Sequence, residues 1–417
     1  MFRGPKFFWV ILAPVFALFV ALRARCYRAR YRAPTILAFV PISMPDVLIP
    51  AVAEPSKWAV IACDQFTGQP EYWSQLAEYV GEAPSALRFV LPEIWLNDKL
   101  DTAPGEIAAA MASSLSDNLF EKHSGYVLVE RTLASGAKRI GLIAAIDLDE
   151  YEYTDISASK IRATEKTVVE RLPARVKVRE LAPLETPHTI VFINDPSEAI
   201  IETLYANRDA YQLLYDFDLN MGGGHIRGWL IPDEDIAGDL IGLERNGLLA
   251  VVGDGNHSLA AAKLTGDTKT LVELENIHSD AIEFEPIHRI VLNADEALIA
   301  ELVEALGDSP LETTVYYQGN AFALPIPSNP AAAIAEIQGF LDEYQAANPE
   351  VEIDYIHGDE HLISVADRTG GVAIFLPKLA KDGLFEYVAH QGVLPRKAFS
   401  VGEPEDKRYY FELAHRQ

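Results

Sequence analysis

Cysteine is nearly absent from this 417-residue chain, which has only Cys26 and Cys63. Two cysteines without paired spacing provide neither a disulfide framework nor a structural zinc site, and they suit a reducing compartment. Cys63 ends the apolar run 58–63, where a buried and inert thiol is expected rather than a nucleophile. The cysteines therefore indicate neither a metal centre nor thiolate chemistry.

The common phosphate, dinucleotide, hydrolase and metalloprotease motifs are absent as well. The sequence contains no GxxxxGK[ST] loop, no GxGxxG after a strand, no GxSxG elbow and no HExxH. Residues 221–225 are rich in glycine, but they do not lead from a strand into a helix. We interpret them first as a loop and only second as a phosphate contact.

Basic residues are scarce relative to acidic ones. The chain has 35 Lys and Arg residues against 61 Asp and Glu residues, a formal net charge of −26. Seven of the basic residues and no acidic ones lie within residues 1–33, so the rest of the chain carries 28 basic residues and a net charge of −33. Such a body repels the phosphate backbone, so nucleic acid is not expected as a partner. With 49% hydrophobic residues, the chain can bury a sizeable core.

Residues 1–45 form an N-terminal extension with two alternative explanations. Residues 7–22 are an uncharged apolar run of 16 residues between basic flanks, shorter than the roughly 20 residues that cross a bilayer. The run is either a membrane anchor, with the basic residues behind it keeping the body cytoplasmic, or part of an over-long start whose true beginning is Met44. We expect a cytoplasmic protein that meets a membrane only if residues 7–22 are an anchor.

Patterns in the rest of the chain predict an α/β (α+β) fold with a mixed sheet. Apolar runs predict a hairpin of strands at 125–131 and 139–148, and further strands at 188–195, 248–252, 287–292, 351–356, 362–366 and 372–376. Helical spacing predicts helices over 103–119, from 196, over 259–264, 295–306 and 330–346. Turn-rich segments at 309–310 and 325–330 predict a boundary near 310–328, between a main α/β domain, 46–310, which carries the site, and a smaller C-terminal α/β part, 311–417.

The strongest local signal is LLAVVGDGNHSLAAAKL, residues 248–264. A short buried strand leads into a Gly-Asp-Gly turn centred on Asp254, and Asn256, His257 and Ser258 open an Ala-rich helix. The first turn of a helix has free backbone N–H groups and the positive end of the dipole, which favour an anion. Asp254 is placed to hold a metal or a ribose hydroxyl, and Asn256 and His257 to bind phosphate oxygens. Alternatively, Asp254 or Asn256 only caps the helix.

A local basic cluster lies within residues 161–179 of this otherwise acidic chain. Its cations suit a phosphorylated or carboxylated ligand, and Glu165 in their midst is a candidate general base or a structural ion partner. The same run also fits a solvated helix face with i,i+4 pairs. The basic pairs at 288–289 and 396–397 are further candidates, either for phosphate binding or for structural pairing.

Several motifs in this order resemble those of a known family. They are SKWAVIACDQFTGQPEYW (56–73), LPEIWL (91–96), IRATEKT (161–167), ERLPARVKVRE (170–180), VGDGNHSLAAAK (252–263), FEPIHR (284–289) and LPRKAFSVGEPEDKRYY (394–410). Over about residues 46–414 the chain resembles the bacterial and archaeal family named domain of unknown function 1015. The name of that family implies no activity.

The turn at Asp254 is also distantly similar to the Asp-Gly-His-His-Arg turn of the ParB/sulfiredoxin-like fold and of the free L-serine kinases built on it. By order along the chain, Glu165 matches the catalytic glutamate of those kinases and residues 396–397 match a basic segment near their C-terminus. Asn256 replaces the first His of that turn, and Ser258 replaces its Arg. This loss removes an expected phosphate ligand, for which Arg162 or Arg289 would have to substitute. The resemblance implies ParB/sulfiredoxin-like core elements in the mixed sheet.

The resemblance further implies a small-molecule phosphotransferase that depends on a nucleoside di- or triphosphate and Mg²⁺, with free L-serine as the leading acceptor. Glu165 would take the proton of the acceptor hydroxyl, Asp254 would hold Mg²⁺, and His257 completes the expected catalytic set. The expected substrate- and phosphate-binding residues are Arg162, Thr164, Arg171, Arg175, Gly255, Asn256, Ser258, His288, Arg289, Arg396 and Lys397. Two alternatives stay open: a phosphatase or other hydrolase of a small phosphometabolite, and a non-catalytic nucleotide-binding sensor. The sequence leaves open the donor, the acceptor and the oligomeric state.

Overall fold

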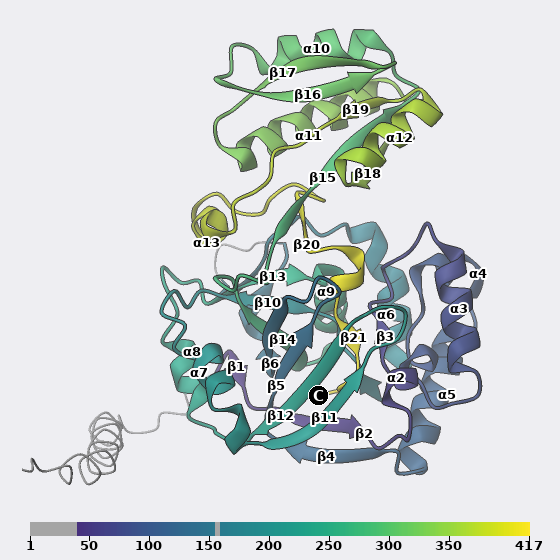
Figure 1. Cartoon of the computed structure of the whole chain (residues 1–417), viewed down its shortest axis with the longest axis vertical. Helices are drawn as coiled ribbons and strands as arrows, with labels where there is room; N and C mark the ends of the chain where they lie inside the picture. The colour runs from purple at the N-terminus through teal and green to yellow at the C-terminus, as the bar shows by residue number, and fades with distance from the viewer. Residues whose placement is uncertain (1–39, 155–158) are drawn as a thin grey trace, which may run out of the picture. The chain divides into compact units, whose positions relative to one another are not determined.

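The computed structural model describes residues 40–154 and 159–417 (Figure 1). The predicted anchor at 7–22 lies outside these residues. Within them, no helix combines the length and the apolar character needed to cross a bilayer. Residues just before Met44 take part in the fold, because Ile42 is fully buried and pairs with Ile146.

A large mixed sheet lies in the lower half of Figure 1. In the described residues it has ten strands in the order β11-β12-β5-β6-β14-β10-β13-β8-β7, with β1 paired to β6. The strands are β1 (Ile42–Ser43), β5 (Tyr126–Thr132), β6 (Lys138–Asp147), β7 (Tyr151–Glu152), β8 (Ile161–Ala163), β10 (Ile190–Ile193), β11 (Gln212–Asp218), β12 (His225–Ile231), β13 (Ala250–Asp254) and β14 (Lys269–Asn276). Strand β10 is parallel to β14, and β8 is parallel to both β13 and β7, whereas the other pairs are antiparallel. The predicted mixed α/β fold and the predicted hairpin, β5-β6, are confirmed.

A second sheet is antiparallel throughout and has six strands in the described residues, in the order β17-β16-β19-β15-β18 with β20 paired to β15. Its strands are β15 (Phe284–Leu292), β16 (Leu311–Tyr317), β17 (Asn320–Ile326), β18 (Glu352–His357), β19 (Val372–Ile374) and β20 (Phe399–Val401). Helices α10 (Glu296–Leu306) and α11 (Pro330–Ala347) pack on one face. Helix α12 (Asp359–Thr369) packs on the other face.

Helix α12 replaces the strand predicted at 362–366, so that prediction is wrong. Leu362, Val365 and Ala366 are buried, whereas Ser364 is exposed. Burial at positions i, i+3 and i+4 is the period of a helix. The short apolar run hid this period, and the glycines Gly358 and Gly370 flank the helix at its two ends.

The remaining helices and short strands lie outside the two sheets. The helices are α2 (Pro55–Trp58), α3 (Pro70–Val80), α4 (Leu96–Lys99), α5 (Ala103–Ser116), α6 (Leu172–Leu181), α7 (Ile201–Ala206), α8 (Ile236–Ile241), α9 (Asn256–Leu264) and α13 (Leu384–His390). Three antiparallel pairs join β2 (Asp46–Pro50) to β4 (Phe120–Ser124), β3 (Val60–Ile61) to β21 (Tyr409–Tyr410), and β9 (Leu184–Glu185) to β22 (Ala414–His415). The end of the chain therefore packs beside segments from its first half.

Helix α7 begins later than the sequence predicts. The helix expected from residue 196 starts at Ile201. The carboxylate of Asp195 accepts backbone N–H groups of Ser197, Ala199 and Ile200. These bonds hold the intervening residues in a turn that competes with the first turn of a helix.

Alternate residues of the central strands point into different cores. On β5, Val127 and Val129 belong to one buried cluster, and Tyr126 and Leu128 to another, as the two-residue period of a strand requires. A third cluster joins the two sheets, since Phe192 of β10 packs against Phe284 of β15. The second sheet thus begins at residue 284, and residues 41–417 form one compact unit. The boundaries predicted at 45/46 and 310/311 stay predictions.

Candidate functional site

Strand β13 ends at Asp254, and the next residue changes the direction of the chain. Gly255 has a φ of +86° and precedes helix α9 as its N-cap, without a side-chain capping bond. A Cβ at this position would lie 2.8 Å from Oγ1 and 2.9 Å from Cα of Thr189, so only glycine fits. The alternative that Asp254 or Asn256 caps the helix is therefore wrong. The N–H groups of the first turn of α9 lack intrahelical partners, as at any helix start.

Asp254 forms a partly buried ion pair that was not predicted from the sequence. Its Oδ1 accepts the N–H of Gly255 at 3.0 Å, and its Oδ2 lies 3.4 Å from Nζ of Lys407. Among the described residues, no donor forms a hydrogen bond with Oδ2, so the contact with Lys407 is electrostatic only. The side chains of Lys407 and Asp254 are 7% and 19% exposed. This places one buried cation and one under-satisfied carboxylate at the turn.

The residue after Lys407 explains how the lysine is held. The guanidinium of Arg408 is buried and donates to Glu273 at 2.8 Å and to Glu412 at 2.6 Å. Two charge-assisted bonds of this kind fix the backbone around Arg408 within the large sheet. Lys407 is thereby held beside the end of β13.

His257 lies in the first turn of α9 and is neutral. Its Nε2 accepts the backbone N–H of Val168 at 3.1 Å, which leaves the hydrogen on Nδ1. Burial, together with the positive charges of Arg175, Arg171 and Lys397, lowers the pKa of His257 to about 4. At neutral pH this ring is therefore a hydrogen-bond donor through Nδ1 and not a cation.

Glu165 follows strand β8 and binds the segment around Lys397. Its carboxylate accepts the backbone N–H of Lys397 at 3.1 Å and that of Ala398 at 3.0 Å, and its backbone forms a bridge with Leu394. Burial raises the pKa of Glu165, although Lys397 and the main-chain hydrogen bonds partly oppose that rise. The predicted catalytic glutamate thus also anchors the basic segment predicted to lie near it.

Asp64 is a third carboxylate near these groups, and it was not among the predicted site residues. Burial raises the pKa of Asp64, but His188, a hydrogen bond from Gln65, Lys397 and Lys407 outweigh burial and bring the pKa to about 2. Asp64 also acts on the pKa of His257. It is therefore ionised, and it shares the environment of both lysines and of the turn.

Two further histidines border this group. The Nδ1 of His188 lies 2.7 Å from the hydroxyl of Tyr410. Burial, with Lys397 and Lys407, lowers the pKa of His357 to about 4. Asp64 and Lys407 both occur in the quoted motifs at 56–73 and 394–410, which was the signal that could have pointed to them.

The predicted cations of the 161–179 cluster divide between two environments. Arg171 and Arg175 lie near the turn, where they pair with Glu93 at 3.8 and 3.2 Å. Arg162 is buried and donates its Nε to the carbonyl of Ser159 at 2.8 Å. Thr164 is also buried and donates to the carbonyl of Val252 at 2.6 Å. Arg162 and Thr164 thus donate hydrogen bonds to main-chain carbonyl groups.

The other predicted pairs lie mainly in structural contacts. His288 is buried, with Nε2 2.8 Å from Asp359 and Nδ1 accepting the N–H of Leu376. Arg289 is fully buried and donates to Gln338 at 2.7 Å and to the carbonyl of Arg396 at 3.2 Å.

Arg396 itself pairs with Asp342 at 3.0 Å. Asn256 and Ser258 lie with His257 in the first turn of α9. The Oδ1 of Asn256 is buried without a hydrogen-bond donor among the described residues. The structure therefore brings together Glu165, Asp254, His257, Arg171, Arg175 and Lys397 of the predicted set.

No group of three or more His, Cys, Asp or Glu side chains in the described ranges could hold a metal ion alone. Mg²⁺, however, commonly uses one or two carboxylates and completes its shell with phosphate oxygens and water. Asp254 fits that mode, because its Oδ2 has no hydrogen-bond donor among the residues that the structure describes.

A comparison with models of known protein families identifies the family of this chain. The model of the family described as "Protein of unknown function (DUF1015)" matches residues 49–351. The chain belongs to this family. This confirms the resemblance noted in the sequence. No curated protein matches the chain significantly.

Three solved structures are similar in fold to part of the chain. The match to a free serine kinase in complex with AMP covers 64% of this chain and 90% of the kinase chain, with 13% identity and a TM-score of 0.40. A conserved hypothetical protein from Pyrococcus furiosus is 12% identical, with 64% and 93% covered and a TM-score of 0.37. SbnI with a C-terminal truncation, from Staphylococcus aureus, is 13% identical, with 62% and 82% covered and a TM-score of 0.37. Similarity at this low identity and TM-score gives no information about the activity of the chain. The ParB/sulfiredoxin-like core stays a prediction.

Proposed function

We propose that this protein is a phosphotransferase that moves phosphate from a nucleoside di- or triphosphate to a small hydroxyl metabolite, with L-serine as the leading acceptor. One observation carries the proposal: helix α9 begins without a side-chain cap beside the buried cation Lys407. Free N–H groups, the positive end of a helix and a cation together favour a phosphate group. Because the net charge of the whole chain is −26, the positive charge at the start of α9 is a local feature of this site.

Phosphoryl transfer needs the phosphates held and their charge neutralised more than it needs covalent help from the protein. The first turn of α9 and the ammonium groups of Lys397 and Lys407 would hold the phosphates. Asp254 would hold Mg²⁺, which when bound withdraws charge from the phosphate oxygens. The neutral ring of His257 would donate its Nδ1 hydrogen to a phosphate oxygen.

Glu165 is the proposed general base for the acceptor hydroxyl. Burial raises its pKa toward the range that base catalysis at neutral pH uses. Each of its oxygens accepts one main-chain N–H, and a carboxylate oxygen has a second lone pair to accept a proton. Asp64, whose pKa is about 2, is a poor base by comparison and suits the recognition of a cationic group.

The same bonds favour one alternative, a nucleotide sensor without turnover. Glu165 is fixed by the N–H groups of Lys397 and Ala398, and the Nε2 of His257 is already used by Val168. If these contacts persist when a nucleotide binds and keep Glu165 away from the acceptor hydroxyl, the site holds phosphate but has no base within reach of that hydroxyl.

A transfer screen on the full chain distinguishes the alternatives. ATP, ADP, CTP and GTP are each offered with Mg²⁺ and a pool of hydroxy amino acids, and phosphorylated products are followed by ³¹P NMR. The matched variants are Asp254→Asn and Glu165→Gln at the site and Asp280→Asn, an exposed aspartate, as the control. We expect transfer that both site variants reduce by at least about a hundredfold, as for loss of a catalytic group, and that Asp280→Asn retains.

Two outcomes would contradict the transferase. Nucleotide binding without any transfer would favour the sensor. Release of phosphate from phosphoserine without a nucleotide would favour a phosphatase.

A further inference from the structure

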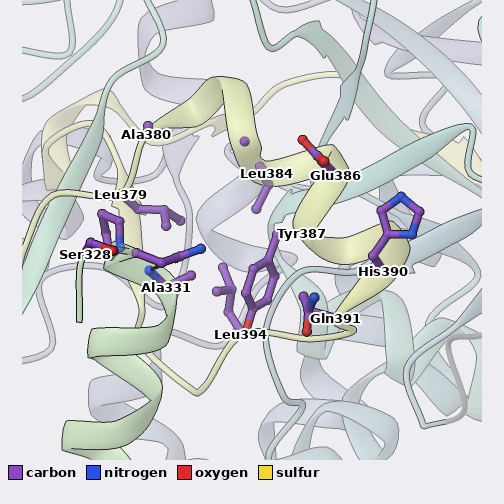
Figure 2. Close-up of a pocket in the computed structure, with 13 residues that line it drawn as sticks. Ser328, Ala331, Leu379, Ala380, Leu384, Glu386, Tyr387, His390, Gln391 and Leu394 are labelled. Atoms are coloured by element: carbon purple, nitrogen blue, oxygen red, sulfur yellow. Dashed lines mark hydrogen bonds between the residues drawn. The ribbon is translucent and has the colours of Figure 1, made fainter. Parts of the chain in front are cut away.

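A large cavity lies apart from the residues of the candidate site. It has a volume of about 740 Å³ and lies between the start of α11 and the segment 379–394, which includes α13 (Figure 2). Its volume is within the range of about 300–1,000 Å³ that is typical of small-molecule sites. None of the residues proposed to bind phosphate lines it.

The charge of the lining excludes an anionic ligand. Among the described residues that line the cavity there is no Lys or Arg, and the ionisable side chains are Glu386, Tyr387 and His390. The start of α11 does not compensate for this. Asn329 already accepts the N–H groups of Ala331 and Ala332, and Pro330 has no N–H to offer. A phosphate or carboxylate would therefore find no lysine or arginine here to neutralise its charge.

The side chains favour a ring with polar edges. In Figure 2, Leu384, Tyr387 and Leu394 lie together at the centre of the cavity wall, while Glu386 and His390 extend from α13 away from them. Leucine side chains and the phenol ring provide apolar faces for a flat ligand. Ser328 and Gln391 also line the cavity, and their hydroxyl and amide groups can form hydrogen bonds with the edges of such a ligand.

We propose that this cavity binds a neutral, ring-containing organic molecule that carries an amide or hydroxyl group. The site is separate from the phosphate site and goes beyond the proposed transferase activity. The two sites have one neighbour in common. Leu394 lines the cavity, and its main chain bonds to Thr164 and Lys166 on either side of Glu165. The bound molecule would thus contact the segment that leads to Lys397.

A pair of matched probes tests both the site and its charge selectivity. Indole-3-acetamide and indole-3-acetate differ in charge but hardly in shape, and their binding to the full chain is measured by calorimetry and ligand-observed NMR. For a probe of this size we expect the amide to bind with a Kd of about 1 mM or below and the acetate at least about fivefold more weakly.

One variant blocks the cavity without disturbing the core. Gly383 lines the cavity, is exposed, has a φ of −88°, and has nothing within 4 Å of where its Cβ would lie. Gly383→Trp therefore places an indole ring at the cavity with little strain. The control is Gly105→Trp in α5, at an exposed glycine that has equally open surroundings.

We expect Gly383→Trp to weaken binding of the amide by at least about tenfold, as for an occluded pocket, and Gly105→Trp to leave it unchanged. Tyr387→Ala, which removes the ring, should weaken it as well. The proposal is overturned if the amide does not bind, if Gly383→Trp and Tyr387→Ala both leave its affinity unchanged, or if the acetate binds as tightly.

Discussion

The protonation of His257 makes a prediction about stability that needs no knowledge of the substrate. Burial, with Arg175, Arg171 and Lys397, lowers the pKa of His257 from an ordinary 6.5 to about 4 in the folded state. Its Nε2 accepts the N–H of Val168, so protonation of that nitrogen would break the bond. The native state therefore binds this proton only at a lower pH than the unfolded state does.

The sign and the size of the effect follow from proton linkage. Above pH 6.5 the ring is neutral in both states, and the stability associated with it is fully present. As the pH falls from 6.5 toward 4, the unfolded state gains a proton that the folded state does not, and this stability is lost. At about 1.4 kcal/mol per pH unit, the difference between 6.5 and about 4 amounts to about 3 kcal/mol. Most of this loss is complete by about pH 4.5.

The substitution His257→Gln isolates this contribution. Glutamine keeps an acceptor for the N–H of Val168 but does not titrate. Urea unfolding is measured at pH 7 and pH 4.5 for both proteins. His357, whose pKa is also about 4, titrates over the same range in both proteins and cancels in the comparison. We expect the advantage of the wild type over the variant to shrink by about 2–3 kcal/mol at pH 4.5. An equal pH dependence in the two proteins would refute the reasoning.

Two further predictions concern the turn itself. Lys407→Met leaves Asp254 without its cation and should lower the free energy of unfolding by about 2–3 kcal/mol. In a double-mutant cycle, adding Asp254→Asn should recover part of that loss. Additive effects of the two substitutions would contradict the pairing. Gly255→Ala should lower the melting temperature more than Gly266→Ala. Both glycines have positive φ angles, +86° and +79°, but only the new Cβ at Gly255 would meet Thr189. Strain in φ alone costs about 1 kcal/mol, so equal losses in the two variants would show that the contact with Thr189 is unimportant.

The local part of the site could be predicted from the sequence, because its signals are local. An apolar run predicts a strand at 248–252, and the glycines around Asp254, together with the Ala-rich segment beyond, predict a turn and a helix. The structure has β13, Gly255 and α9 in this order. The pattern did not reveal that glycine itself is the N-cap. Glycine is required at this position because Thr189, the residue before β10, lies too close to Gly255 to leave room for a Cβ.

The partners of the predicted residues could not be read from local patterns. The pairing of Lys407 with Asp254 depends on where a distant segment crosses the end of β13. Glu165 was found by its residue type and its basic neighbours, but its actual partners are main-chain N–H groups at 397 and 398. Similarly, His288 and Arg289 are cationic candidates in sequence, yet they lie buried in a sheet with Asp359 and Gln338 as partners. Tertiary packing, rather than local propensity, decides between a ligand contact and a structural pair.

The account depends most on the claim that the turn at Asp254 and the lysines beside it bind the phosphates of a nucleotide. Calorimetric titration of the full chain with ADP and Mg²⁺, repeated with Lys397→Ala, tests it most directly. Lys397 has an exposed side chain, so the variant should fold normally. The account predicts that ADP binds and that Lys397→Ala weakens binding about tenfold, the effect of losing one charge-assisted contact. Absence of ADP binding, or the same affinity in the variant, would contradict it.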